Sequence, residues 1–431
     1  MILFLSNTCL VIAQNRNLEK EAAKKYPDYL FEATKVMVYD VINPAAAARY
    51  YAYACLAGYL ADKAHTTGPA PDFLGKLNEY DHLNYRPDSK SNPSLASTYA
   101  MLDVARRMLP SGEILTDVID QLVADYSTKH KLSKNAISAS IETAQAVSSH
   151  ILAYSRTDHF NELSAKIGYT PKTGPGYWYP TPPAYMSAVE PNWNTLRTFI
   201  LDSASQFIPK VPTPFDMDVQ SEFYKDQLMG VFNAVNNLTP EQRTIASFWD
   251  CNPFAVEMTG HMAIGFKKIT PGGHWMGITG IACKKENYNL KQTLSAHALV
   301  ALTLHDAFVS CWDEKYRSER IRPETVINQH LDESWRPVLQ TPPFPEYTSG
   351  HSVISSAAST ILTAIFSDDY RFIDDTQIFF GLAEREFTSF RAAAQEAAIS
   401  RFYGGIHYMD SCENGVGQGR HIGDFIIGKI F

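Results

Sequence analysis

Apolar residues recur at helical rather than alternating spacing along most of the chain. The spacing predicts helices over residues 45–62, 95–109, 113–129, 135–155, 219–236, 241–248, 291–312, 349–366 and 376–400. Alternating runs of Val, Ile and Thr bounded by turn pairs, which are typical of strands, are scarce. We therefore expect an all-α protein.

Residues 169–193 break this pattern. The segment YTPKTGPGYWYPTPPAYMSAVEPNW is rich in Pro, Gly and aromatic residues, which excludes a continuous helix. Its aromatic side chains favour an ordered crossover over a flexible linker. A crossover at residues 169–215 predicts two four-helix-type bundles packed together, at residues 14–168 and 216–431. The second bundle carries the candidate chemistry described below.

The first residues, 1–13, are mostly apolar and small, and the sequence then turns polar. Val11 and Ala13 fit the −3 and −1 positions before a signal-peptidase cut at Gln14, although a basic segment ahead of them is missing. We expect a partial signal peptide and a periplasmic or secreted location, with a plain N-terminal strand or helix as the alternative. No other segment approaches the ~18 uninterrupted apolar residues of a membrane span.

Composition narrows the class of protein. The chain has 431 residues, and 38 Lys and Arg against 46 Asp and Glu give a net charge of −8, which argues against a nucleic-acid partner. Its six cysteines include no C-x-x-C pair, so zinc ligation is not expected and buried free thiols are. No heptad seam indicates a partner helix, and a monomer is the default. A globular enzyme or binding protein remains.

Two cations mark the first candidate motif, within CWDEKYRSERIRP. Lys315 and Arg322 are seven residues apart, which is two helical turns, so both would project from nearly one helix face. Trp312 would lie on that face too, and Pro323 places Arg322 where the helix ends. The alternative for this segment alone is a solvated basic face.

The second motif begins a helix after the prolines of TPPFPEYTSGHS. Ser349, Gly350 and His351 form its first turn, with Thr348 or Ser349 as the N-cap. Free N–H groups at a helix start can bind an anion. An ordinary capped helix that happens to carry a histidine is the alternative.

The third motif is SRFYGGIH. A helix is expected to end near Ser400, and the glycines at 404 and 405 would turn the chain so that Arg401 and His407 face one point. The alternative is a glycine C-cap beside a surface arginine.

Taken together, the three motifs describe an oxyanion pocket. Lys315, Arg322 and Arg401 supply three cations, and arginine binds tetrahedral oxyanions in a bidentate manner. Burying three cations without an anion would cost too much free energy, so a multiply charged oxyanion is implied. One histidine would be the ligand or nucleophile and the other the acid–base.

The motifs Lys315-x6-Arg322-Pro323, Ser349-Gly350-His351 and Ser400-Arg401-x5-His407 resemble the signature of vanadium-dependent haloperoxidases and of type 2 phosphatidic-acid-phosphatase-like acid phosphatases. The segments GPGYWYPTPP and TPPFPEYTSGHS extend the resemblance to bacterial vanadium haloperoxidases, most of all to the iodoperoxidases of marine flavobacteria. One departure is Thr348, where the phosphatase-like pattern usually has Pro.

The resemblance implies a vanadate cofactor, with vanadium bonded to the ring nitrogen of His407. It also implies hydrogen peroxide and a halide as substrates and hypohalous acid as the product. His351 would be the acid–base, and Lys315 would polarise the oxidant. The cofactor would be held by Lys315, Arg322, Ser349, Gly350, Arg401 and His407.

Two aromatic residues favour the haloperoxidase branch over the phosphatase branch. Trp312 lies three residues before Lys315, and Phe344 lies seven before His351, at the offsets that the resemblance leads us to expect for a halide pocket. Core packing is the alternative for both. Phe344 is the residue type of chloroperoxidases at that offset, but the wider resemblance favours iodide.

Two rival functions use the same pocket. In an acid phosphatase, His407 would form a phosphohistidine and His351 would protonate the leaving group. In a non-enzymatic oxyanion-binding protein, the two histidines would have no chemical role, which makes this reading the weakest.

Weaker signals surround the motifs. Asp306 and Asp313 are candidate partners of the pocket cations, and His305 beside Asp306 is expected to support the site helix. The glycine-rich residues 415–419 are expected to form a turn into the last helix.

Overall fold

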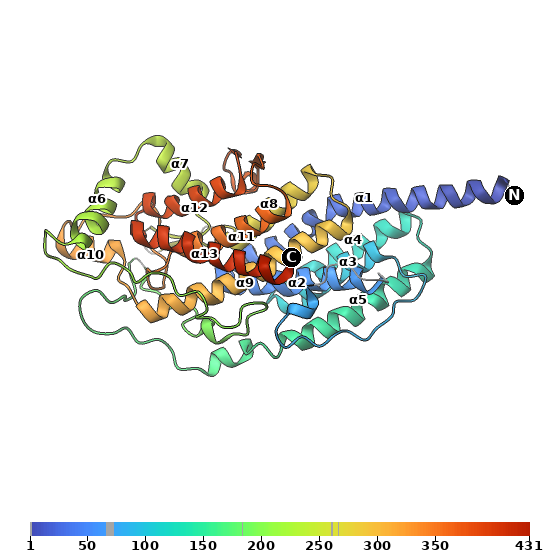
Figure 1. Ribbon diagram of the computed structural model, residues 1–431, viewed down its shortest axis with the longest axis horizontal. Helices are drawn as coiled ribbons and strands as arrows, with labels where there is room; N and C mark the ends of the chain where they lie inside the picture. The colour runs from blue at the N-terminus through green and yellow to red at the C-terminus, as the bar shows by residue number, and fades with distance from the viewer. Residues whose placement is uncertain (1, 66–72, 183, 260–261, 266) are drawn as a thin grey trace.

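Helices dominate the computed structural model, which describes residues 2–65, 73–182, 184–259, 262–265 and 267–431 (Figure 1). The all-α prediction is confirmed. The helices are α1 (Ile2–Tyr39), α2 (Pro44–His65), α3 (Pro93–Met108), α4 (Leu115–Thr128), α5 (Lys134–Ser155), α6 (Met229–Asn236), α7 (Pro240–Phe248), α8 (Pro271–Lys285), α9 (Leu290–Ser318), α10 (Pro323–His330), α11 (Gly350–Ile365), α12 (Phe390–Tyr403) and α13 (Met409–Ile430).

Strands are few and short. The hairpin of β1 (Val256–Thr259) and β2 (Met262–Gly265) is antiparallel, as is the pair of β3 (Phe372–Asp374) and β4 (Arg385–Phe387). A π-helical stretch, Phe223–Leu228, leads into α6 where a single helix was expected from residue 219.

Helix α9 joins the two halves of the molecule. It packs on α1 and α2 as well as on α8, α11 and α13, so one apolar core runs through both halves. A capping box between Asn289 and Gln292 starts it. Its composition and length would suit a membrane span, but 94% of its most apolar stretch is buried by the other helices. Its apolar surface therefore serves as core.

The segment between α5 and the π-helical stretch is non-helical apart from short 3₁₀ turns. Trp178 and Trp193 are completely buried, whereas Tyr185 is exposed. Backbone hydrogen bonds hold the segment on the C-terminal half, from Trp178 N–H to the carbonyl of Glu319 (2.7 Å) and from Val189 N–H to that of Pro343 (3.0 Å). The buried tryptophans explain why this segment is ordered despite its prolines.

Two expectations about the C-terminal part are wrong. The helix expected at residues 376–400 starts only at Phe390, where Ser389 caps it, because β3 and β4 pair and Gly381 turns left-handed (φ 83°) before it. Residues 415–419 form no turn and lie inside α13. Their glycines let α13 approach α11, since a Cβ at Gly419 would lie 2.1 Å from the carbonyl oxygen of Val353.

The N-terminal segment is helical, and the described cysteines are free thiols. Residues 2–13 belong to α1, whose first turns extend past the other helices (Figure 1), and the cut before Gln14 stays a prediction. Buried free thiols are confirmed at Cys55, Cys251, Cys283, Cys311 and Cys412. The side chain of Cys9 lies outside the described part of the chain.

Candidate active site

The three motifs converge on one pocket at the end of α9. Lys315 lies in the last turn of α9, Arg401 lies in the last turn of α12, and His407 lies in the loop before α13. Motif residues and aromatic residues line the pocket together, among them Cys251, Phe254, Trp312, Phe344, Gly350, His351, Arg401 and His407.

Lys315 and Arg322 do not share a helix face, so the expected two-turn spacing is wrong. Helix α9 ends at Ser318, because Glu319 adopts a left-handed conformation (φ 48°), and Arg322 is the N-cap of α10. The loop before α11 brings both cations together. Lys315 Nζ donates to the carbonyls of residues 345, 346 and 348 (3.1, 3.1 and 2.6 Å), and Arg322 Nε and Nη2 donate to that of residue 344 (3.0 and 2.9 Å).

The three cations are buried and lack a carboxylate partner. Lys315, Arg322 and Arg401 are at most 1% exposed, and no ion pair within the described ranges joins any of them to an acidic side chain. Burial lowers all three pKa values, and with the nearby charge of Arg322 it lowers that of Lys315 to about 8. The Nε and Nη2 atoms of Arg401 are buried without a hydrogen-bond partner. This concentration of positive charge calls for an anion.

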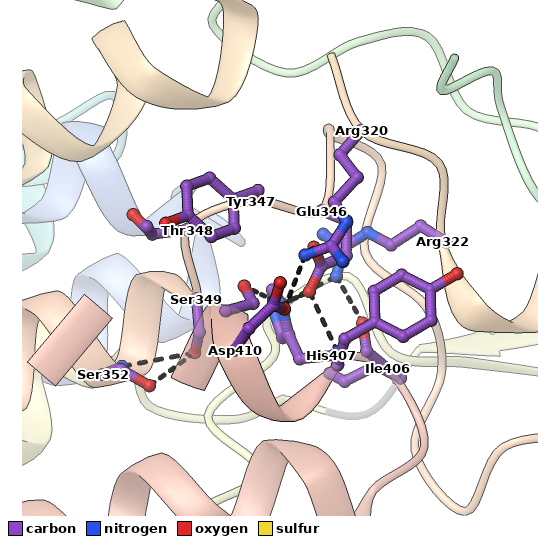
Figure 2. A network of polar contacts seen from close by, with 12 residues as sticks. Arg320, Arg322, Glu346, Tyr347, Thr348, Ser349, Ser352, Ile406, His407 and Asp410 are labelled. Carbon is purple, nitrogen blue, oxygen red and sulfur yellow. Dashed lines mark hydrogen bonds and ion pairs between the residues drawn. The ribbon is translucent and has the colours of Figure 1, made fainter. Parts of the chain in front are cut away.

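The contacts of His407 define its tautomer (Figure 2). Arg322 Nη1 lies 3.1 Å from Nε2 of the ring, and because a guanidinium can only donate, Nε2 must accept. The proton is then on Nδ1, which donates to Glu346 Oε1 at 2.8 Å. Burial and the charges of Arg322 and Lys315 lower the pKa of His407 well below its usual value. The ring is therefore neutral, with a lone pair on Nε2 that is suited to bind a metal.

Glu346 is a functional residue that the motifs do not include. Its fully buried carboxylate also accepts from the backbone N–H of Tyr408 (3.1 Å) and faces Arg320 at 3.4 Å. Arg320 in turn pairs with Asp410 at 2.6 Å (Figure 2). The signal that could have pointed to Glu346 is a lone charge within the proline-rich segment before the Ser-Gly-His motif, where a charged residue has to be paired if it is buried.

Of the two residues expected as the N-cap of α11, Thr348 and Ser349, the structure shows Ser349. Ser349 Oγ accepts from Ser352 Oγ at 2.8 Å and from Ser352 N–H at 3.4 Å, which leaves its own hydroxyl proton free to donate. His351 follows in the first turn, and its Nε2 accepts from Arg401 Nη1 at 3.0 Å. Burial and the Arg401 charge lower the pKa of His351 well below its usual value. His351 is therefore a neutral base facing the pocket.

Trp312 and Phe344 form an aromatic wall beside the cations. Their ring centroids are 5.1 Å apart, and Lys315 Nζ lies 5.8 Å from the Trp312 ring and 5.1 Å from the Phe344 ring. Both side chains are buried and both line the pocket, where they limit access of water to the charged groups.

The two aspartates expected as partners of the cations have other partners. Asp306 accepts from the backbone N–H groups of residues 199, 200 and 201 (2.6, 2.7 and 2.9 Å), so it fixes the crossover on α9. Asp313 accepts from Asn194 (3.0 Å) and pairs with Arg317 (3.2 Å). The expectation for both is wrong, because their positions on α9 face the crossover and the last helical turn.

Known proteins share the fold and part of the sequence of this chain. Residues 295–430 match the family model described as the VCPO second helical-bundle domain. No curated protein matches the chain in a sequence search. Among solved structures, a bacterial vanadium-dependent chloroperoxidase in its holo form superposes with a TM-score of 0.69 at 17% identity, covering 90% of this chain and 92% of the other, which shows the shared fold.

A second solved structure is much more similar. It is described as the first bacterial vanadium-dependent iodoperoxidase, and it is 42% identical to this chain, with a TM-score of 0.87 and coverage of 96% of this chain and 97% of the other. Identity at this level over nearly the whole of both chains, together with the pocket described above, identifies the chain as a member of the vanadium-dependent haloperoxidase family.

Proposed function

We propose that the protein oxidises iodide with hydrogen peroxide to hypoiodous acid, using vanadate as its cofactor. Iodide is supported by the 42% identity to a protein described as an iodoperoxidase. The observation that carries the proposal is the set of three buried cations, which form no ion pair with a carboxylate among the described residues and act electrostatically on the neutral His407 ring.

The residues present fit vanadate. The unpartnered Nε and Nη2 atoms of Arg401 are donors that an oxyanion would satisfy, and Lys315 and Arg322 add positive charge. Nε2 of His407 would bind the metal, and Ser349 and Gly350 would donate at the start of α11. When bound, vanadate supplies a vanadium(V) centre that acts as a Lewis acid toward peroxide.

The side chains around this position divide the remaining work. His351, neutral at physiological pH, is placed to take a proton from hydrogen peroxide. Lys315 provides a cation that polarises the oxidant. Trp312 and Phe344 keep water away and present polarisable ring surfaces to a large halide.

One assay tests the proposal against its rivals. Iodide oxidation with peroxide is measured on vanadate-stripped protein before and after vanadate is added, next to p-nitrophenyl phosphate hydrolysis without vanadate. We expect vanadate-dependent oxidation of iodide in preference to bromide and chloride. Hydrolysis that vanadate only inhibits, with no halide oxidation, would instead identify an acid phosphatase, and vanadate binding without either activity would identify a binding protein.

We also propose that the protein is exported as a monomer, with residues 1–13 removed. The small residues Val11 and Ala13 before Gln14 support the cut. N-terminal sequencing of protein recovered from the periplasm should begin at Gln14, and light scattering should give the mass of one chain. An uncut chain in the cytoplasm, or a larger particle, would contradict these expectations.

A further inference from the structure

A cysteine, a histidine and an aspartate outside the haloperoxidase motifs form a hydrogen-bonded chain. Cys251 follows α7, His274 lies in the first turns of α8, and Asp374 ends β3. The sulfur of Cys251 is 3.4 Å from His274 Nδ1, and His274 Nε2 is 2.7 Å from Asp374 Oδ2. Activated nucleophiles in enzymes have this arrangement, in which the nucleophile lies within reach of a base and a third group orients that base.

The histidine of this triad is held in one position. Asp374 Oδ1 accepts from the hydroxyl and the backbone N–H of Thr376 (2.7 and 3.0 Å), which fixes the carboxylate. The His274 ring stacks on Trp249 with centroids 4.4 Å apart, and the Gln377 amide lies 3.1 Å from Nδ1. Burial alone lowers the pKa of His274, but Asp374 and Cys251 raise it to about 10. The contact with Asp374 thus favours the charged form of the His274 ring.

The triad adjoins the pocket that would receive peroxide. Cys251 lines the pocket together with His351 and Arg401, and the carbonyl of Trp249, two residues earlier, accepts from Arg401 Nη1 at 2.9 Å. Cys251 also interacts electrostatically with the Arg401 guanidinium. A neighbouring cation stabilises the negative charge that develops on a sulfur when it reacts as a nucleophile.

We propose that Cys251, His274 and Asp374 form a thiol oxidation site, at which hydrogen peroxide converts Cys251 to a sulfenic acid. The thiolate attacks one peroxide oxygen, so that an S–O bond forms and the O–O bond breaks. The leaving hydroxide takes the proton from His274 Nδ1 and departs as water. Sulfur loses two electrons and peroxide gains them, and Cys251–SH plus H₂O₂ gives Cys251–SOH plus H₂O. This inference rests on the proposed function in one respect only, namely that a haloperoxidase pocket is a place that hydrogen peroxide enters in the cell.

Cys283 provides the matched control within the same chain. It is as buried as Cys251, but burial raises the pKa of its thiol to about 12, and its hydrogen-bond partner is Thr293 rather than a charged histidine. Buried cysteines of this kind are inert toward peroxide. The two thiols therefore differ in their chemical surroundings and not in their exposure.

The test uses full-length, vanadate-free protein, so that failure of the haloperoxidase proposal cannot affect it. Hydrogen peroxide and dimedone, which traps sulfenic acids, are added without iodide, and peptide mass spectrometry gives the labelling rate at each cysteine. We expect Cys251 to react at least ~10-fold faster than Cys283 in the folded protein, and at a rate similar to Cys283 in urea. Labelling of Cys251 no faster than that of Cys283 in the folded protein overturns the proposal.

Two variants separate the triad from simple access to the pocket. Asp374→Asn keeps the shape of the side chain but removes the charge that orients His274, so labelling of Cys251 should slow by ~10-fold or more. Asp375→Asn makes the same chemical change one residue later, at a side chain outside the triad, and should leave that rate unchanged. Equal rates in Asp374→Asn and wild type, with both proteins folded by circular dichroism, contradict the role of the triad.

Discussion

Two buried groups of side chains in this protein, one around Arg49 and one around the pocket cations, differ in how their positive charge is balanced. In the N-terminal half, Arg49 makes two hydrogen bonds to the carboxylate of Asp158 (2.6 and 3.2 Å), which also accepts from Tyr53 (2.9 Å). In the pocket, the hydrogen bonds that Lys315, Arg322 and Arg401 make within the described part of the chain go to neutral groups such as backbone carbonyls and histidine nitrogens. The first group is complete within the chain, whereas the second is complete only with an anion. Unbalanced charge thus distinguishes a binding site from a structural ion pair.

The largest loss of activity is expected when His407, the proposed metal ligand of the pocket, is removed. His407→Ala should lower vanadate-dependent iodide oxidation by more than ~100-fold, which exceeds the effect typical of residues that only support a ligand. Vanadate affinity, measured by isothermal titration, should fall with it. Retained affinity and activity would show that the Nε2 lone pair is not the ligand.

A matched pair of substitutions contrasts the two groups directly. Arg49→Met leaves the buried Asp158 charge uncompensated and should destabilise the protein by ~3–5 kcal/mol. Arg401→Met removes a cation that has no carboxylate partner and should change stability by less than about 1 kcal/mol while weakening vanadate binding. Urea unfolding of the vanadate-free proteins, with vanadate titrations, measures both. Equal losses of stability would erase the distinction between the groups.

The unbalanced charge of Lys315 should make the free energy of unfolding depend on pH. The pKa of Lys315 is lowered from 10.5 to about 8 in the folded protein, so between these pH values the unfolded chain binds more protons. The free energy of unfolding of vanadate-free protein should therefore rise with pH across this window, by up to roughly 3 kcal/mol.

The control for this measurement is Lys315→Met, which should lack the rise. Vanadate binding should show the opposite trend and weaken above pH ~8 as Lys315 loses its charge, relative to the same variant. If the free energy of unfolding changed with pH in the same way in wild type and variant, folding would not lower the pKa of Lys315.

The smallest effect is expected at Glu346, the carboxylate that accepts a hydrogen bond from the His407 ring. Glu346→Gln keeps the shape of the side chain but weakens its hold on His407 Nδ1–H, and vanadate affinity should fall by ~10–100-fold. Glu346→Asp should recover part of it. ¹⁵N chemical shifts of the His407 ring in vanadate-free protein report the tautomer and should show mixed protonation only in Glu346→Gln. An unchanged spectrum would limit Glu346 to balancing charge.

Local patterns predicted the helices and the pocket residues well. The helices expected from residues 95, 135, 241 and 291 by apolar spacing start at residues 93, 134, 240 and 290, and the three motifs named the cations and both histidines. Long-range contacts are where local patterns failed. Glu346 acts through His407, 61 residues later in the chain, and no spacing rule links the two.

Glycines account for other differences. Helix α8 lies outside the predicted helices, because its glycines resemble helix breakers. In the structure they allow close packing, since a Cβ at Gly280 would lie 2.7 Å from Pro27. Lys315 and Arg322 reached one pocket by a route other than the predicted one, because backbone carbonyls of the loop before α11, and not a helix face, gather them.

The burial of α9 has a consequence for biosynthesis. Its apolar surface is covered by α2, made early, and by α11, which ends 47 residues after α9 does. A ribosome therefore releases this long apolar helix before α11 exists to cover it, and during that interval its exposed apolar surface can be bound by chaperones. His407, still later in the sequence, can join the pocket only when translation is nearly complete.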